Sequence, residues 1–381
     1  MTDTVPEEGR VLADADIGID LRLHAYAAGG ISRYARRLAR EMTEILPPKR
    51  LTLISHRREA EPLQLPGVRT YSAWTPPHHR LERFAFGTEL LPLGLDLLHS
   101  TDFIPPRWGA KRHVITIHDL NFLYYPQYLM AEARRYYNEQ IEWAVRHADA
   151  ILVDSYATRE DLNTLLGVPP ERVTVAHLAA SEQFRPLSVD RVKPVLARHD
   201  LEPGYLLFVG VWEPRKNLPG LFEALTLLRD RGYARSLVVV GRPGWLYQEI
   251  FDTVEALNLN TAVRFLEDLT FEELIAVYNG AVALVLPSFY EGFGFPALEA
   301  MQCGIPTVVA DRASLPEVVG DAGLLIDPED PETIADACER VLVDADLRVE
   351  LREAGLVRAR QFTWRKTAQI TAQVYHEALS S

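Results

Sequence analysis

Short apolar runs alternate with amphipathic stretches along almost the whole chain, and this alternation limits the fold more than any other feature. Apolar runs of strand length lie at residues 16–20, 51–55, 95–99, 114–118, 150–153 and 173–177, and then at 205–209, 236–240, 263–266, 281–286, 307–310 and 323–326. Segments with helical periodicity lie between them, for example 31–46, 218–231, 270–279 and 332–343. Strands that alternate with helices are typical of parallel sheets covered by helices, so the sequence predicts an α/β protein.

The chain is long enough to predict two domains, because 381 residues exceed what one hydrophobic core usually supports. Residues 184–204 are polar, contain three prolines and show no periodicity, so we expect a linker there. The predicted domains are residues 1–185 and 204–363, two doubly wound, Rossmann-like units that face a cleft with ligands at the carboxyl ends of their strands. A final helix, residues 364–381, follows the second domain. The sequence is compatible with this helix packing back onto the first domain.

The composition is that of a globular enzyme, with 48% hydrophobic and 24% charged residues. No apolar run approaches the length of about 20 residues that spans a bilayer, and the acidic N-terminus does not resemble a secretory signal, so we expect a cytoplasmic protein. The net charge of −13 makes nucleic acid a poor partner. The two cysteines, Cys303 and Cys338, lack metal-site or redox spacing, which predicts buried free thiols.

The most specific segment, residues 288–301, reads Ser-Phe-Tyr-Glu-Gly-Phe-Gly-Phe-Pro-Ala-Leu-Glu-Ala-Met and follows a buried strand. Gly292 and Gly294 allow close backbone approach to a ligand, Pro296 suits the first turn of a helix, and Gly304 is placed to end that helix. A glycine loop that leads into a helix N-terminus presents N–H groups and a positive dipole end. We therefore predict a diphosphate site in this loop.

Two glutamates frame the same segment. Glu291 and Glu299 have seven residues between them, and Glu-Gly-Phe-Gly-Phe-Pro-Ala-Leu-Glu resembles the Glu-x7-Glu signature of the retaining GT-B glycosyltransferases of family 4 (group 1). The resemblance covers nearly the whole chain. It implies that Glu291 contacts hydroxyls of the donor sugar and that Glu299 holds the ribose hydroxyls. The loop residues Gly292, Phe293, Gly294 and Phe295 are assigned to the donor site with them.

A second segment, residues 208–217, reads Phe-Val-Gly-Val-Trp-Glu-Pro-Arg-Lys-Asn and also leads from a strand to a helix. Lys216 resembles the family lysine that neutralises the pyrophosphate as the nucleotide leaves. The family often has an arginine directly after the glycine, but Val211 follows Gly210 here, which makes Arg215 the candidate substitute. Gly210 and Gly241, both at strand ends, are assigned to the donor pocket by topology. For Arg215 and Lys216, the alternative explanation is a basic turn whose side chains are exposed to solvent.

The first half contributes a glycine pair and a histidine. Gly29 and Gly30, in Gly-Gly-Ile-Ser-Arg-Tyr, resemble the family's glycine-rich loop that approaches the donor phosphate and the acceptor. His118 ends a buried strand and resembles the family histidine that hydrogen-bonds the transferred sugar. The role of Asp119, whether it orients His118 or caps the next turn, stays open.

Four arginines follow the glycine pair at residues 33, 36, 37 and 40, and Ser32 or Gly30 is expected to cap their helix. They are compatible with an anionic acceptor or a membrane surface, although a solvated helix face is the commoner explanation.

The resemblance implies transfer of a hexose from a nucleoside diphosphate sugar to a saccharide or lipid-linked acceptor, with retention and without a metal or other cofactor. The motif forms look most like mannosyltransferases of bacterial surface-polysaccharide assembly, so GDP-mannose is the first donor and UDP-glucose the second. A non-hydrolysing nucleotide-sugar epimerase and a non-catalytic nucleotide-sugar binding protein stay open as alternatives, as does peripheral contact with the inner membrane face. A dinucleotide-dependent oxidoreductase is disfavoured, because no strand is followed by Gly-x-Gly-x-x-Gly.

Overall fold

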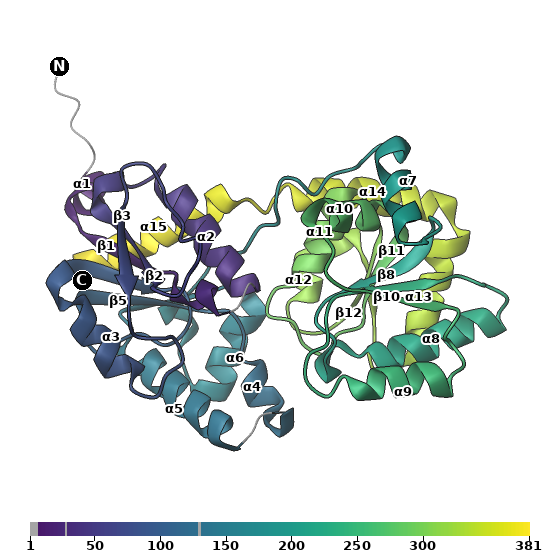
Figure 1. Ribbon diagram of the computed structural model, residues 1–381, viewed down its shortest axis with the longest axis horizontal. Helices are drawn as coiled ribbons and strands as arrows, with labels where there is room; N and C mark the ends of the chain where they lie inside the picture. The colour runs from purple at the N-terminus through teal and green to yellow at the C-terminus, as the bar shows by residue number, and fades with distance from the viewer. Residues whose placement is uncertain (1–6, 27–28, 129–130) are drawn as a thin grey trace. The chain divides into compact units, whose positions relative to one another are not determined.

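The chain folds into two compact units, seen in a computed structural model that describes residues 7–26, 29–128 and 131–381 (Figure 1). Unit 1 comprises residues 1–178 and 363–381, and unit 2 comprises residues 179–362. Each unit has one parallel sheet covered by helices. This arrangement confirms the α/β class with two doubly wound sheets that the alternating pattern predicts.

The sheet of unit 1 has seven strands among the described residues, in the order β3-β2-β1-β4-β5-β6-β7. All neighbouring strands pair in parallel. The strands are β1 (Ile17–Asp20), β2 (Leu51–His56), β3 (Arg69–Ala73), β4 (Leu95–Ser100), β5 (Ala110–Ile117), β6 (Ala150–Val153) and β7 (Val173–Val175). The helices are α1 (Glu7–Asp14), α2 (Gly30–Met42), α3 (Glu82–Leu90), α4 (Asn121–Tyr124), α5 (Ala131–His147), α6 (Tyr156–Leu166) and α15 (Trp364–Ser380).

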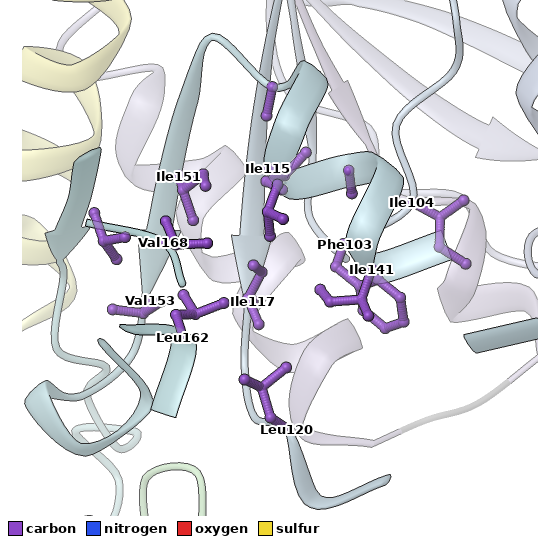
Figure 2. Close-up of a cluster of buried hydrophobic side chains, with 14 of the residues drawn as sticks. Phe103, Ile104, Ile115, Ile117, Leu120, Ile141, Ile151, Val153, Leu162 and Val168 are labelled. Carbon is purple, nitrogen blue, oxygen red and sulfur yellow. The ribbon is translucent and has the colours of Figure 1, made fainter. Parts of the chain in front are cut away.

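Alternating residues of β5 and β6 point to one face of this sheet and form a core with α5 and α6. Figure 2 shows Ile115, Ile117, Ile151 and Val153 packed with Leu162 and other apolar side chains. The second half of β5 and nearly all of β6 are buried on both faces, which explains why residues 114–117 and 150–153 read as short, largely apolar runs.

The C-terminal helix α15 belongs to unit 1 and lies beside α2 (Figure 1). The Tyr375 hydroxyl lies 2.7 Å from His99 Nδ1, and the other ring nitrogen of His99 lies 2.7 Å from Thr116 Oγ1. Thr116 alternates with Ile115 and Ile117, so α15 covers the face of the sheet opposite to α5 and α6. The last helix therefore completes the core of the first unit.

The sheet of unit 2 has six strands among the described residues, in the order β10-β9-β8-β11-β12-β13, again all parallel. The strands are β8 (Tyr205–Val209), β9 (Leu237–Val240), β10 (Val263–Leu266), β11 (Ala281–Leu286), β12 (Thr307–Ala310) and β13 (Leu324–Ile326). The helices are α7 (Val189–Arg198), α8 (Leu218–Asp230), α9 (Gln248–Ala256), α10 (Phe271–Gly280), α11 (Phe295–Cys303), α12 (Leu315–Val319), α13 (Pro331–Val343) and α14 (Ala345–Ala359). Cys303 and Cys338 are buried free thiols, as predicted.

The prediction of an aperiodic linker over residues 184–204 is wrong, because this segment contains helix α7, which packs on α10 of unit 2. Val192 and Leu196, four residues apart, bury one face of α7. Pro194 lies inside the helix, and its presence made the segment read as a break. The chain first passes from unit 1 to unit 2 between residues 178 and 179, earlier than the predicted domain end at 185 and the predicted start of the second domain at 204.

Two smaller differences concern unit 1. Helix α2 begins with Gly29 as its N-cap residue and without a side-chain cap, so neither Ser32 nor Gly30 caps it. The sequence does not indicate strand β3, which lies at the edge of the sheet, because its mostly exposed residues show no apolar pattern. Among the described residues, no helix has both the length and the apolar character needed to cross a membrane.

Candidate functional site

The strand order of unit 2 changes direction between β8 and β11, which are neighbours in the sheet although they are not consecutive in the chain. In doubly wound sheets, ligands bind outside the carboxyl ends of the strands at such a switch point. The two segments that contain the predicted site residues, 208–217 and 288–301, lie at the ends of these two strands. Topology therefore brings the loop after β8 and the loop after β11 to one place.

The loop after β11 has the geometry that its residues predict. Gly294 is the N-cap residue of α11 with a φ of 102°, Pro296 lies in the first turn, and Gly304 ends the helix in the left-handed region with a φ of 70°. Because L-residues rarely adopt this φ, and because a Cβ on Gly294 would lie 2.7 Å from Leu315 Cδ2, the fold itself favours glycine at this position. Gly292 and Phe295 are half-buried in the same turn.

The loop after β8 forms a 3-10 turn, η6 (Pro214–Lys216), and then enters α8. Asn217 caps α8 from the left-handed region, with a φ of 53°, and its side chain accepts a hydrogen bond from the Gly220 N–H at 3.3 Å. Asparagine tolerates this backbone conformation better than most residues. The turn places Arg215 and Lys216 at the end of β8 and buries Lys216.

Lys216 and Glu291 form the centre of the site. Lys216 Nζ lies 2.5 Å from Glu291 Oε1, and both side chains are 8% exposed. Ser288 Oγ donates a hydrogen bond of 2.8 Å to the same carboxylate, and Arg215 contacts its other oxygen at 3.3 Å. Arg215 also pairs with Glu213 at 2.6 Å. The positive charges of Lys216 and Arg215 thus balance the negative charges of Glu213 and Glu291 in one buried cluster.

The cluster keeps Glu291 ionised. Burial by itself would raise the pKa of Glu291, but the charges of Lys216 and Arg215 outweigh it and lower the pKa to about 2. The pKa of Lys216 is lowered, first by burial and then by repulsion from Arg215, with Glu291 opposing both. Glu291 is consequently a hydrogen-bond acceptor at neutral pH, able to accept from sugar hydroxyls.

Backbone contacts join the two loops. The Phe289 N–H donates to the Arg215 carbonyl at 2.8 Å, and Arg215 donates from its guanidinium to the Tyr290 carbonyl at 2.9 Å. Ser314 Oγ donates to the Glu291 carbonyl at 2.8 Å. The position of Glu291 is therefore set by backbone as well as by side-chain partners.

Glu299 lies on α11, apart from the Lys216 ion pair. Its side chain accepts a 2.8 Å hydrogen bond from the Tyr278 hydroxyl of α10, and it is 3% exposed. Glu299 thus pairs with a residue of α10, whereas Glu291 pairs with the loop after β8.

Gly210 and Gly241 meet at the ends of β8 and β9. The Gly210 N–H donates to the Val240 carbonyl at 2.9 Å, and a Cβ on Gly241 would lie only 1.9 Å from the Gly210 carbonyl oxygen. Close backbone packing explains Gly241 without a ligand. Phe293 is also buried, and its ring packs against Phe295 and Phe362 at centroid distances of 5.6 and 5.9 Å.

In unit 1, Gly29 and Gly30 lie at the start of α2, after β1. The strand order of this sheet also changes direction beside β1, between β1 and β4. A Cβ on Gly29 would meet nothing within 4 Å, so no protein neighbour requires glycine at this position.

His118 follows β5 and is held from both sides. Its Nδ1 lies 2.6 Å from Asp154 Oδ2, and its Nε2 lies 2.9 Å from the Thr101 carbonyl oxygen. Burial would lower the pKa of His118, but the Asp154 carboxylate outweighs it and raises the pKa to about 9. Asp119 accepts from the Asn121 N–H at 3.1 Å and so caps the next turn, while Asp154 orients the histidine.

Sequence reasoning gave no role to Asp154, Ser288, Glu213 or Tyr278. Asp154 follows the predicted strand 150–153 directly, so its place at a carboxyl edge is readable from the sequence. Ser288 and Glu213 lie inside the two motifs. Tyr278 carries no local signal, because only the packing of α10 against α11 brings it to Glu299.

Comparisons with known proteins show which families and structures the chain is similar to. A family model described as glycosyl transferases group 1 matches residues 195–358, and one described as glycosyltransferase family 4 matches residues 28–181. The chain is 36% identical over 281 residues to the O-antigen chain mannosyltransferase B of Escherichia coli, covering 73% of this chain and 74% of the relative.

Solved structures share the fold. Sucrose-phosphate synthase from Thermosynechococcus elongatus matches with a TM-score of 0.78 and 21% identity, over 96% of this chain and 99% of the other. Anabaena HepE in complex with UDP and glucose matches with a TM-score of 0.74 and 17% identity, over 96% and 100% of the two chains. At these identities the likeness concerns the fold alone.

Proposed function

Because the chain belongs to the group 1 (family 4) glycosyltransferases with the GT-B fold, we propose that it transfers a hexosyl group from a nucleoside diphosphate sugar to a hydroxyl acceptor. The observation that carries this proposal is the buried Lys216–Glu291 pair at the switch point of unit 2. A cation and an ionised acceptor side by side match the diphosphate and the hydroxyls of such a donor.

The residues of the cluster have separate tasks in this proposal. Lys216 and Arg215 compensate the negative charge that grows on the nucleoside diphosphate as the glycosidic bond breaks. The N–H groups at the start of α11 contribute their positive dipole end to the same phosphates. Glu291 accepts hydrogen bonds from hydroxyls of the sugar, and Glu299 accepts them from the ribose. These protein charges support transfer without a bound metal.

We propose retention at the anomeric carbon, with the leaving phosphate assisting deprotonation of the acceptor on the same face of the sugar. His118 is proposed to hydrogen-bond the transferred sugar. With its pKa raised to about 9, the ring is protonated at neutral pH and can act only as a donor. To reach a sugar hydroxyl, its Nε2–H would exchange the Thr101 carbonyl for the ligand.

The preferred donor is GDP-mannose, with UDP-glucose second, and the proposed role is polysaccharide or glycolipid biosynthesis. The mannosyl preference is supported by the name of the Escherichia coli relative, O-antigen chain mannosyltransferase B. The second choice is supported by Anabaena HepE, which was crystallised with UDP and glucose.

A binding panel tests the proposal. The protein in EDTA is titrated with GDP-mannose, GDP, UDP-glucose, UDP and NAD while the melting temperature is followed, since a ligand that binds only the folded state raises it. We expect a rise with one nucleoside diphosphate, which Glu291→Gln and Glu299→Gln weaken and the exposed control Glu171→Gln leaves unchanged. A response to NAD alone, or to none of these nucleotides, would contradict the proposal.

Product analysis separates a transferase from an epimerase. A transferase consumes the donor rapidly only when an acceptor hydroxyl is present, and then yields a glycoside. Without an acceptor it hydrolyses the donor slowly. Rapid conversion of the nucleotide sugar to an epimer or to free nucleotide without acceptor would favour the epimerase instead.

A further inference from the structure

Tyr34 of helix α2 packs against His118, although the two residues lie far apart in the sequence. Their ring centroids are 4.9 Å apart, and the ring planes are nearly perpendicular, at 78°. Tyr34 is 1% exposed, whereas the side chain of His118 is 12% exposed. The histidine can therefore meet a ligand, and the buried tyrosine can act on that ligand only through its neighbours.

The hydroxyl of Tyr34 is anchored to the sheet of unit 1. Its oxygen lies 2.9 Å from Thr116 Oγ1 of β5. Thr116 precedes His118 by two residues, the spacing at which side chains of an extended chain share a face. Thr116 Oγ1 lies in turn 2.7 Å from His99 Nε2, and His99 Nδ1 lies 2.7 Å from the Tyr375 hydroxyl of α15. A buried chain of hydrogen bonds thus holds the ring of Tyr34 in place.

The groups of this chain are uncharged at neutral pH. Burial raises the pKa of the Tyr34 phenol well above its usual range, against a smaller lowering by the hydrogen bond to Thr116. Burial also lowers the pKa of His99 to about 3. A phenol that stays protonated is unsuited to accept a proton from an acceptor, so the contribution of Tyr34 is the placement of its ring.

The hydrogen bonds of His118 leave one motion of its imidazole weakly restrained. Nδ1 lies 2.6 Å from Asp154 Oδ2, and Nε2 lies 2.9 Å from the Thr101 carbonyl oxygen. These bonds fix two points of the ring, whereas the tilt about the line that joins them is resisted only by the angular preference of the bonds. The perpendicular ring of Tyr34 resists this tilt directly.

We propose that Tyr34 is a positioning residue for His118. Its ring, held by Thr116, keeps the imidazole in the one orientation from which Nε2–H reaches the transferred sugar. The orientation of the imidazole stands on unit 1 alone, and only its consequence for transfer rests on the proposed function. The proposal also gives a task to the tyrosine of the segment Gly-Gly-Ile-Ser-Arg-Tyr, which the glycine pair leaves unexplained.

NMR relaxation of the imidazole C–H groups tests the orientation on the full chain, because it reports ring motion from picoseconds to milliseconds. The His118 signals are identified by their absence in His118→Gln. We expect the same restricted motion in the wild type and in Tyr34→Phe, which keeps the ring. In Tyr34→Leu the ring is lost and the motion of His118 should increase. Unchanged motion in Tyr34→Leu would overturn the proposal.

Initial rates test the consequence for transfer. Tyr34→Leu should lower kcat by about 10- to 100-fold, because small misplacements of a reacting contact cost about 10²-fold in rate, and Tyr34→Phe should restore most of this loss. In a His118→Gln background, Tyr34→Leu should lower kcat no further, since its effect passes through the imidazole. Additive losses in the double variant would overturn the proposal.

Leu38→Ala is the matched control. Leu38 is fully buried one turn further along α2, so its truncation destabilises the packing of the same helix. This variant should keep wild-type motion of His118 and wild-type kcat. Losses equal to those of Tyr34→Leu would show that the stability of unit 1, and not the ring contact, controls His118, which would overturn the proposal. If Tyr34→Leu does not fold, Thr116→Val replaces it, and unchanged motion of His118 there would also overturn the proposal.

Two outcomes separate the positioning from the proposed function. If His118 becomes mobile in Tyr34→Leu while His118→Gln transfers sugar at the wild-type rate, the role proposed for His118 fails and the positioning by Tyr34 stands. If the wild type transfers sugar from none of the nucleotide donors, the proposed function fails, and the relaxation of His118 alone decides the positioning.

Discussion

Replacing Lys216 by methionine is the sharpest test of the proposed donor site, because this side chain has both a structural and a chemical task. In the wild type its Nζ lies 2.5 Å from Glu291 Oε1, and both side chains are 8% exposed. Methionine fills a similar volume without the charge. The variant therefore leaves the Glu291 carboxylate buried, with Arg215 at 3.3 Å and Ser288 at 2.8 Å as its remaining side-chain partners.

The expected loss of stability is about 3 kcal/mol. Removing one partner of a buried ion pair costs about 3–5 kcal/mol, and the lower end applies because Arg215 and Ser288 still contact Glu291. The pKa of Glu291 indicates the same size, since its lowering from 4.5 to about 2 corresponds to about 3 kcal/mol between the two protonation states. Because the pKa is lowered on folding, this stabilisation is present above pH 4.5 and is lost as the pH falls toward 2.

The catalytic loss should be separate from the loss of stability. Without Lys216 we expect kcat to fall by about 10²–10³, the effect of removing one charge-stabilising contact from a transition state. The double variant Lys216→Met/Glu291→Leu removes both charges and should regain at least about 1 kcal/mol of the lost stability without regaining activity. Urea unfolding and initial rates with the donor identified by the panel measure the two quantities.

The exposed lysine Lys366 provides the matched control, and Lys366→Met should change stability by less than about 0.5 kcal/mol. Wild-type stability in Lys216→Met would refute the buried ion pair. Wild-type kcat in a folded Lys216→Met variant would refute the role of Lys216 in stabilising the leaving group. Recovery of activity in the double variant would contradict any direct contact of Glu291 with the donor.

The remaining predictions concern His118 and two glycines. In Asp154→Asn, the pKa of His118 should fall from about 9 to below 6.5, because burial then acts without the opposing carboxylate, and NMR titration of the imidazole C–H signals measures this midpoint. The free energy of unfolding of the wild type should correspondingly decline between pH 6.5 and 9, since a raised pKa stabilises the fold only while the histidine is protonated. A titration midpoint of His118 that Asp154→Asn leaves unchanged would show that another group holds the proton. Gly241→Ala should cost about 3 kcal/mol, because its methyl group would lie 1.9 Å from the Gly210 carbonyl oxygen. In Gly29→Ala the new methyl group would meet no atom within 4 Å, so the stability should change by less than about 1 kcal/mol. Equal losses of stability in Gly241→Ala and Gly29→Ala, measured by thermal unfolding, would contradict the packing described at these glycines.

The loops of the candidate site are readable from the sequence because their geometry depends on local backbone chemistry. Gly294, Pro296 and Gly304 have conformational preferences that act within a few residues, and the structure has them at the N-cap, first turn and C-cap of α11 as predicted. Buried strands are equally readable, since β6 and β11 are apolar on both faces and their runs are unbroken.

Two elements escape local reasoning. Strand β3 is mostly exposed at a sheet edge, so no apolar pattern marks it. Helix α7 contains Pro194, which locally indicates a break, yet Val192 and Leu196 bury one face of the helix. In both cases the stabilising contacts are made with another element, β2 for β3 and α10 for α7.

The sequence by itself determined the order of most strands and helices, the family resemblance and the identity of Lys216 and Glu291 as candidates, because propensity, periodicity and turn chemistry act over a few residues. Only the tertiary structure decided that these two side chains, 75 residues apart in the chain, form one ion pair. It likewise paired His118 with Asp154 and brought Tyr375 of the last helix to His99 in the first unit, across 276 residues. The physical reason is that the order of strands in a sheet depends on long-range packing, and this order decides which strand ends, and so which charges, become neighbours.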